Sequence, residues 1–264
     1  MKKKVKHIYG PVFSWRIGRS LGLDILGGKK KICNFDCNYC QLGNKPSFAF
    51  KRKVFVPFSG IMNEIRSLGK LDVDYLTFSG CGEPTLAKNL GQAIKELKKK
   101  TKNKIAVITN STLLSKKEIR NSLAKADFVL VKLDAASQEA LKAVNRPAKG
   151  ITLKNILGGI MQFRKEFKGK FGLQIMFVEK NRDEYKNIAK LASKIMPDEI
   201  QINTPLRQSA VKPLSKKEMT KITEYFKNLP ALKNTKIISV YDAHKKKTKP
   251  INVKETVKRR GAEN

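Results

Sequence analysis

Apolar runs of strand length alternate with amphipathic helical segments along this chain, and that alternation limits its fold more than any other feature. The runs that we expect to be strands cover residues 21–26, 75–80, 105–109, 128–134, 173–178 and 199–203. Most are almost continuously apolar, which is typical of parallel strands covered on both faces. Helical spacing of apolar residues predicts helices over 86–97, 153–167, 185–195 and 219–229. These six units predict an α/β fold, a partial (β/α)6 TIM-like barrel with parallel strands.

One domain accounts for most of the chain. The alternating pattern fills residues 1–242, and residues 243–264 are predicted to form a basic C-terminal tail that is flexible or loosely docked. No apolar run approaches the roughly 20 residues that span a bilayer, and no apolar signal segment follows the basic start. Three of the four cysteines are clustered. We therefore expect a cytoplasmic protein, taken to be a monomer without a membrane partner, whose cysteines bind metal.

The charge of the chain is strongly basic. There are 56 Lys+Arg against 22 Asp+Glu, which gives a formal net charge of +34, and only 11 of the basic residues are arginine. Such an excess attracts polyanions at low salt, although a compositional bias toward lysine would produce the same count. One group of lysines surrounds a predicted helix end, at positions 95, 98, 99, 100, 102 and 104. The charge favours a nucleic acid among the partners, with compositional bias as the alternative.

Polar residues collect where the predicted strands end. In barrels of this kind, the chemistry lies where strands run into the loops that follow them. Any one of these polar residues could be an ordinary helix cap, but four polar strand ends on the rim that also carries the cysteines predict a pocket. The candidate residues are Gly80, Gly82 and Glu83 after the second strand, Asn110 and Ser111 after the third, Lys132 and Asp134 on the fourth, and Asn203 and Thr204 after the sixth.

Three cysteines, Cys33, Cys37 and Cys40, form a C-x3-C-x2-C loop after the first predicted strand. A cubane [4Fe–4S] cluster has four irons, and each needs one ligand beyond its sulfides. Three thiolates therefore leave one iron open, which is what a metal centre needs if a substrate is to bind it. The alternative is a closed four-cysteine zinc or iron–sulfur site completed by Cys81, which otherwise reads as a small residue of the pocket wall.

The loop CNFDCNYC (33–40) resembles the cysteine motif of the radical S-adenosylmethionine (radical SAM) enzymes, including an aromatic residue, Tyr39, before the last cysteine. SGCGEPTL (79–86) is similar to their GGE motif on the second strand, and TNS (109–111) and KLDA (132–135) fall at the next two strand ends. From GPVFSWRIGRSLGLD (10–24) through VNRP (144–147) to QINTPLR (201–207), the chain resembles small archaeal and bacterial relatives of the tRNA wybutosine-synthesising radical enzymes.

This resemblance implies two cofactors, a [4Fe–4S] cluster on Cys33, Cys37 and Cys40, and S-adenosylmethionine chelating the open iron. It implies that Glu83 accepts from the amine of the methionine part, where Gly80 and Gly82 allow close backbone approach. The resemblance assigns the remaining contacts as follows: Lys132 to the carboxylate, Asn110, Ser111 and Asp134 to the ribose or methionine, and Asn203 and Thr204 near the adenine.

The implied reaction is reductive cleavage of S-adenosylmethionine to a 5′-deoxyadenosyl radical, which takes a hydrogen atom from the substrate. The electron would come from a ferredoxin or flavodoxin. Because neither cofactor explains the charge of +34, we expect an RNA substrate, most simply a tRNA. The alternatives are a radical activase or modifying enzyme acting on a protein, peptide or small molecule, and a non-enzymatic iron–sulfur RNA-binding module.

The N-terminal stretch SWRIGRSLG (14–22) allows two interpretations. In one, Trp15 packs under the barrel and Arg16 and Arg19 are solvated. In the other, Arg19 and Ser20 lie near the cluster or the substrate.

Overall fold

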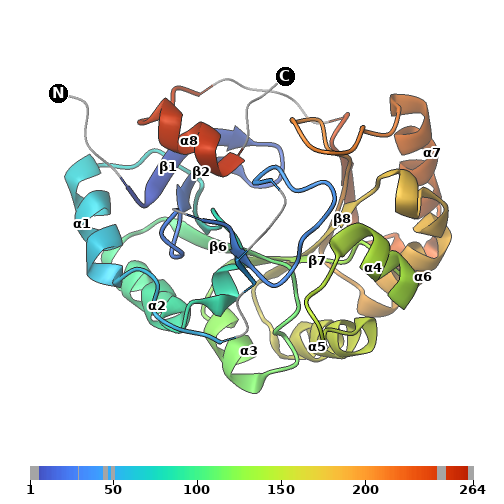
Figure 1. The fold of residues 1–264 in the computed structure, drawn as a ribbon, viewed down its shortest axis with the longest axis horizontal. Helices are drawn as coiled ribbons and strands as arrows, with labels where there is room; N and C mark the ends of the chain where they lie inside the picture. Colours follow the sequence, from blue (N-terminus) through green and yellow to red (C-terminus); the bar gives the residue numbers. More distant parts are fainter. Residues whose placement is uncertain (1–5, 29, 44–46, 49–50, 243–247, 261–264) are drawn as a thin grey trace.

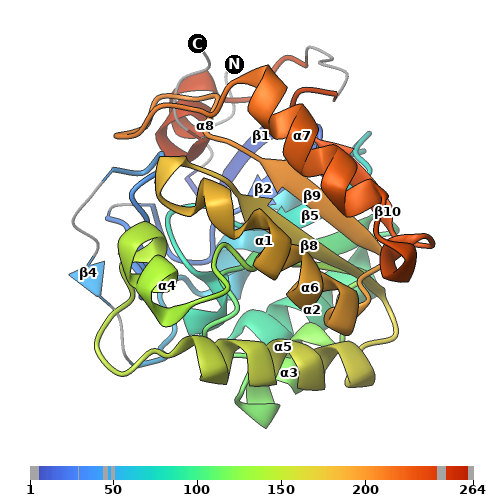
Figure 2. The same ribbon diagram turned by 90° about the vertical axis from the view of Figure 1, so that its right-hand side faces the viewer.

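A curled eight-stranded sheet forms the centre of the molecule (Figures 1 and 2). The computed structural model describes residues 6–28, 30–43, 47–48, 51–242 and 248–260. The strands, in spatial order, are β1 (Ile8–Ser14), β2 (Gly18–Leu23), β5 (Tyr75–Phe78), β6 (Lys104–Thr109), β7 (Phe128–Lys132), β8 (Lys170–Met176), β9 (Glu199–Asn203) and β10 (Lys236–Ser239). All neighbours from β2 to β10 are parallel, and β1 pairs antiparallel with β2 at one edge. Two short strands, β3 (Ile32–Cys33) and β4 (Ser47–Phe48), pair separately.

The predicted fold class is confirmed, because the parallel strands curl into an incomplete barrel. All six predicted strands are present, with bounds shifted by a few residues. The sheet also contains β1 and β10, which the sequence patterns did not reveal. Strand β1 contains Gly10 and Pro11, both of which are uncommon inside strands, and β10 has only four residues, of which one is buried. Both strands lie at edges of the sheet, where the apolar signal is weakest.

Helices surround the outer face of the sheet and supply the crossovers between its parallel strands (Figure 2). Four were predicted, and they appear as α2 (Leu90–Lys100), α5 (Leu153–Glu166), α6 (Tyr185–Ile195) and α7 (Lys216–Lys227). Each buries an apolar stripe, and α7 also begins with a capping box in which Ser215 and Glu218 bond each other's backbone N–H. The remaining helices are α1 (Phe58–Leu68), α3 (Lys117–Leu123), α4 (Gln138–Asn145), α8 (Val253–Arg260) and the 3-10 turns η1 (Pro84–Leu86), η2 (Glu179–Glu184) and η3 (Pro230–Leu232).

The two faces of the sheet bury different sets of side chains. Alternate strand residues such as Ile105 and Val107 join the large core under the helices. The opposite face lines the lumen of the barrel, where Ile17, Ala106, Phe128 and Leu130 form a separate apolar floor. Because side chains alternate along a strand, the residues beyond this floor also point into the lumen, and these are mainly polar.

The C-terminal segment differs from the loose tail expected from sequence. Residues 248–260 pack on the N-terminal hairpin, and α8 lies over β1 and β2 (Figure 1). Gly10 N donates to Thr256 Oγ1 at 3.0 Å, and Ile251 N donates to Gly10 O at 2.6 Å. The prediction failed because α8 has little apolar surface of its own and is held by polar contacts with distant residues. Residues 243–247 and 261–264 of the predicted tail lie outside the described residues.

Candidate functional site

The loop with the three cysteines is attached to the end of β5 through backbone contacts. Ile32 N donates to Cys81 O at 2.8 Å, and Glu83 N donates to Ile32 O at 2.9 Å. A Cβ on Gly82, whose φ is +147°, would overlap the Ile32 carbonyl, and one on Gly80 would lie 2.7 Å from Cγ of Asp24. Glycine at position 82 is what lets the backbone of Ile32 approach β5 so closely, and the predicted approach of S-adenosylmethionine to these two glycines stays a prediction.

Residues 144–147 hold the other side of the cysteine loop. Asp36 N donates to Asn145 O at 3.0 Å, and Asn38 N donates to Val144 O at 2.9 Å. The Asn145 side chain also donates from Nδ2 to Cys37 Sγ at 3.4 Å and to Tyr39 Oη at 3.1 Å. Sequence reasoning quoted VNRP as part of a resemblance but gave Asn145 no role. No sequence signal pointed to Asn145, because residues 138–145 were not among the predicted helices and its contacts with Cys37 and Tyr39 join segments more than 100 positions apart.

Asp134 is buried and binds the cysteine loop through its carboxylate. Tyr39 Oη donates to it, Asn145 Nδ2 donates to Oδ2 at 2.8 Å, and Met176 N donates to Oδ1 at 2.8 Å. Lys132 Nζ lies 3.3 Å from Oδ1. Burial, and then the neighbouring Asp134, raise the pKa of Tyr39 well above its usual value, so the phenol stays protonated as a donor. Asp134 therefore positions the loop, and its predicted contact with S-adenosylmethionine stays a prediction.

The sulfur atoms of the loop have the surroundings of cluster ligands. Phe35 N donates to Cys33 Sγ at 3.4 Å, and Asn110 Nδ2 lies 3.6 Å from the same sulfur. N–H groups directed at cysteine sulfurs are one means by which proteins adjust iron–sulfur clusters. Burial, and then the nearby Cys37, raise the pKa of the Cys33 thiol, while burial and Asp134 raise that of Cys37 to about 11. Bound iron would reverse this effect, because a metal deprotonates the thiols that it binds.

The three loop cysteines fit a cubane better than a single metal ion. Among the described residues, no group of three or more His, Cys, Asp or Glu could hold one metal ion. A cubane presents its irons at separate corners, so its three thiolates need not converge on one point. Cys81 is buried, and the charged groups that act on it are Asp24, Arg259 and Lys258, whereas those around Cys33 are the other loop cysteines and Glu83. The geometry thus gives no support to a four-cysteine zinc site.

Glu83 lies at the centre of the strand-end network. Its Oε1 accepts from Thr85 N at 3.0 Å, Thr85 Oγ1 at 2.6 Å and Thr109 Oγ1 at 2.7 Å, and its Oε2 accepts from Asn110 N at 2.6 Å. Burial raises the pKa of this carboxyl group. A carboxylate offers about four acceptor sites, divided between its two oxygens, so Oε2 keeps room for one further donor. Glu83 can therefore still accept from an ammonium group.

Asn110 and Ser111 connect strand ends to each other and to the cysteine loop. Asn110 Nδ2 donates to Asn34 Oδ1 at 2.7 Å. Ser111 Oγ bridges the backbone O and N of Lys132, both at 3.0 Å, and Ser111 has a φ of +71°. A serine in the left-handed region costs free energy, and such residues cluster at functional sites. The structure brings Asn110 to the cysteine loop and Ser111 to the end of β7.

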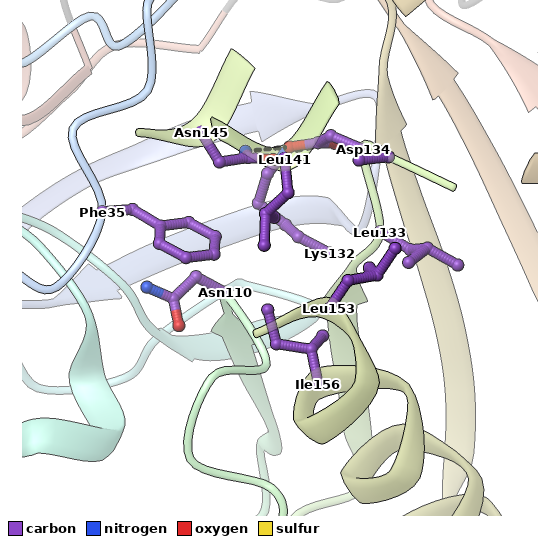
Figure 3. A pocket seen from close by; sticks show the side chains of 10 residues that line it. Phe35, Asn110, Lys132, Leu133, Asp134, Leu141, Asn145, Leu153 and Ile156 are labelled. Carbon is purple, nitrogen blue, oxygen red and sulfur yellow. Dashed lines mark hydrogen bonds and ion pairs between the residues drawn. The ribbon is translucent and has the colours of Figure 1, made fainter. Parts of the chain in front are cut away.

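Lys132 and Asp134 border a small cavity below the loop, together with Asn110 and Asn145 (Figure 3). Its volume is about 10 Å³, and the rest of its wall is apolar, with Phe35 from the cysteine loop. A space of this size holds about one water molecule. Lys132 Nζ also lies 5.1 Å from the centre of the Tyr39 ring, and the lysine side chain is 13% exposed, so it lies largely within the site rather than on the open surface.

The two candidates after β9 have different surroundings. Thr204 Oγ1 donates to Phe177 O at 2.9 Å and accepts from Leu214 N at 2.9 Å, so its hydroxyl already holds the following loop. Asn203 is 3% exposed and lies in register with Met176. Both residues are buried, and their predicted place near the adenine stays a prediction.

The N-terminal hairpin contradicts the functional interpretation of Arg19, whereas that of Ser20 stays a prediction. Arg19 is partly exposed at the amino end of β2 and is ion-paired with Asp72 and Asp74. Ser20 Oγ is 2.7 Å from Thr77 Oγ1 inside the lumen. Arg16 is the arginine of this stretch that turns inward, and it lies beside β9, where Gln201 Nε2 donates to Arg16 O at 2.9 Å.

Basic residues occur at both ends of the barrel. The predicted lysine group lies at the end of α2 and the start of β6, roughly 20 Å of strand from the site at 3.3 Å per residue. Two of its members are paired, Lys98 with Asp127 at 2.7 Å and Lys100 with Glu96 at 3.8 Å. Exposed cations also surround the site itself, at Lys30, Lys142, Arg146, Lys149 and Lys258. The lysine group at the end of α2 is therefore too far from the site to contact a small ligand bound there.

Residues 30–192 match the family model described as the Radical SAM superfamily. A UPF0026 protein of Synechocystis sp. is 43% identical over 201 residues, which is 76% of each chain. A protein of Brachyspira hyodysenteriae named GTPase Obg is 34% identical over 264 residues, which covers 97% of this chain and 38% of that protein. The structure of Streptococcus suis SuiB bound to S-adenosylmethionine superposes with a TM-score of 0.63 at 15% identity, covering 80% of this chain and 48% of that one.

This chain thus spans about half of SuiB and less than half of the Brachyspira protein. Over the described residues, none of the helices is both long enough and apolar enough to cross a membrane.

Proposed function

This chain belongs to the radical S-adenosylmethionine superfamily, and from that premise we propose that it modifies a structured RNA, most simply a tRNA. It is an enzyme whose cofactors are a [4Fe–4S] cluster and S-adenosylmethionine. When bound, they supply the electron and the 5′-deoxyadenosyl radical that removes a hydrogen atom from substrate. The protein's task is to position these groups and to exclude water.

The cluster ligands in this proposal are Cys33, Cys37 and Cys40. Support comes from the burial of Cys33, from the partial burial of Cys37 and Cys40, and from the amide donors that Asn110 and Asn145 direct at two of the three sulfurs. Glu83 receives the ammonium group of S-adenosylmethionine at the free acceptor position of Oε2. Lys132 binds the carboxylate, since it lies at the strand end next to the loop, and Asn203 contacts the adenine.

The observation that carries the choice of RNA is the net charge of +34. The cluster and S-adenosylmethionine need little of this charge. The exposed cations that border the site, such as Lys142, Arg146 and Lys149 on and after α4, would contact phosphates around an exposed base. The lysine group near β6 would contact a more distant part of a large RNA. The kinship with wybutosine-synthesising enzymes belongs to the same proposal and rests on the motifs quoted above.

The partners that complete this proposal are few. A small acidic electron donor, such as a ferredoxin or flavodoxin, would bind the basic surface and reduce the cluster. We expect the enzyme to act as a monomer in the cytoplasm.

The test is anaerobic reconstitution with iron and sulfide, reduction in the presence of S-adenosylmethionine, and mass spectrometry for 5′-deoxyadenosine. Added tRNA should increase the yield of 5′-deoxyadenosine and acquire a mass shift, while an equal mass of heparin should do neither. Gel shifts should show tRNA affinity that falls steeply with salt. Cleavage stimulated by a peptide fraction instead of tRNA would refute the RNA proposal, and RNA binding without any cleavage would indicate the non-enzymatic module.

A further inference from the structure

A row of polar side chains crosses the lumen of the barrel below the cysteine loop. Lys132, Gln174 and Gln201 are register partners on β7, β8 and β9, so they lie side by side on the lumen face. Lys132 Nζ is 3.4 Å from Gln174 Oε1. Gln174 Nε2 and Gln201 Oε1 are buried, yet neither has a hydrogen-bond partner among the described residues. Buried polar atoms are rarely left unpaired in native proteins, so this row is one side of a binding site.

Arg16 lies next to this row, in the turn between β1 and β2. Its Nε is buried without a partner in the described part of the chain, and its guanidinium is 5.2 Å from the centre of the Trp15 ring. Burial, and then Arg207 and Arg260, lower its pKa to about 9; Tyr9 acts in the opposite sense. None of these groups is a carboxylate. Arg16 is half-buried, and among the described residues its guanidinium has no acidic partner to offset the water it has lost, which is unfavourable until an anion binds.

Arg207 links this region to the cysteine loop. It lies four residues beyond β9, and its Nη1 donates to Gln41 Oε1 at 3.3 Å, where Gln41 directly follows the last loop cysteine. The same nitrogen is 3.3 Å from Arg260 O at the end of α8. Arg207 and Arg260 thus lie beside the cysteine loop, and both are close enough to Arg16 of the first hairpin to act on its charge.

We propose that Arg16 and Arg207 bind a phosphate group of a nucleotide substrate in the lumen, with the Gln174 amide as a further donor. The chain uses lysine for most of its charge, since only 11 of its 56 basic residues are arginine, yet it places arginine here. The planar guanidinium binds phosphate through two hydrogen bonds at once, whereas lysine acts as a point charge. The choice of a nucleotide as the ligand rests on the proposed function. The inference that the lumen contains a phosphate-binding site does not rest on it.

Trp15 makes a direct test possible, because it is the only tryptophan of the chain and Arg16 stacks on it. The intrinsic fluorescence of the reconstituted protein is titrated with pyrophosphate, adenosine 5′-monophosphate, adenosine and acetate. We expect the two phosphates to shift the emission saturably, and adenosine and acetate to have little effect. Arg16→Gln should weaken the binding of both phosphates on the order of tenfold, and Arg16→Lys less, because lysine keeps the charge but not the paired hydrogen bonds.

The matched control is Arg19→Gln, which removes the same charge three residues away at an exposed position paired with Asp72 and Asp74. It should leave the titration unchanged. Equal phosphate affinity in wild type and Arg16→Gln, with both proteins folded by circular dichroism, overturns the inference. Stronger binding of acetate than of phosphate also overturns it and indicates a carboxylate-bearing peptide or small molecule. These results do not depend on tRNA, so failure of the RNA proposal alone would leave phosphate binding intact.

Discussion

Arg259 in α8 forms an ion pair with Asp24 at the end of β2, with Nε and Oδ2 2.8 Å apart and both side chains at most 1% exposed. Asp24 also accepts from Leu26 N at 3.0 Å, and it lies against Gly80 and Cys81 in the strand-end motif. The last helix of the described chain is therefore connected to the rim of the candidate site by a buried charge pair. Removing either partner would leave the other charge buried and uncompensated.

We predict that Arg259→Met lowers the free energy of unfolding by about 3–5 kcal/mol, as expected when one member of a buried pair is lost. Urea denaturation of the cluster-free protein, followed by circular dichroism, measures this change. Lys258→Met is the matched control, because the neighbouring side chain is exposed and should cost less than about 0.5 kcal/mol. The double variant Asp24→Asn/Arg259→Met should recover part of the loss. Equal stabilities of the two single variants would show that the pair contributes nothing in solution.

Gly82→Ala should separate the cysteine loop from the end of β5. The added Cβ would overlap the Ile32 carbonyl, and φ of +147° is unfavourable for alanine. We therefore expect the free energy of unfolding to fall by about 3 kcal/mol or more. The midpoint temperature of thermal denaturation and the iron content after reconstitution should both fall. Gly158→Ala is the control, since a Cβ there meets no atom within 4 Å inside α5, and helix propensity should raise stability by about 0.5–1 kcal/mol. Full iron loading of Gly82→Ala would contradict this account.

The parallel strands could be predicted from sequence because they are buried on both faces and read as apolar runs. The docked C-terminal helix could not, because α8 is held against the hairpin by contacts with residues more than 230 positions away, such as Arg259 with Asp24. At the site, residue types at strand ends predicted which side chains would meet. They did not reveal which of these side chains bond to other parts of the protein. Asp134 and Thr204 do so, and each holds a loop in place.

Asn145→Ala tests whether the residues that hold the loop also support the cluster. The change removes donors to Cys37 Sγ and to the Asp134 carboxylate, so we expect slower or incomplete cluster incorporation, lower 5′-deoxyadenosine yield and a shifted cluster reduction potential. Iron content, visible absorbance and a redox titration measure these effects. Asn155→Ala, at an exposed position near the start of α5, should match the wild type. An unchanged potential and iron content in Asn145→Ala would show that these hydrogen bonds serve only the fold.

The number of cysteine ligands can be tested by four single substitutions. Changing Cys33, Cys37 or Cys40 to Ala should each abolish reductive cleavage of S-adenosylmethionine and greatly reduce iron content, because one corner of the cubane loses its ligand. Cys81→Ala should retain iron and cleavage, because the Cys81 thiol faces Asp24 and burial raises its pKa to about 12. Serine at position 81 gives a second variant of similar size. If Cys81→Ala and Cys81→Ser both lost the metal, and zinc rather than iron were found in the wild type, a four-cysteine structural site would replace the open cluster.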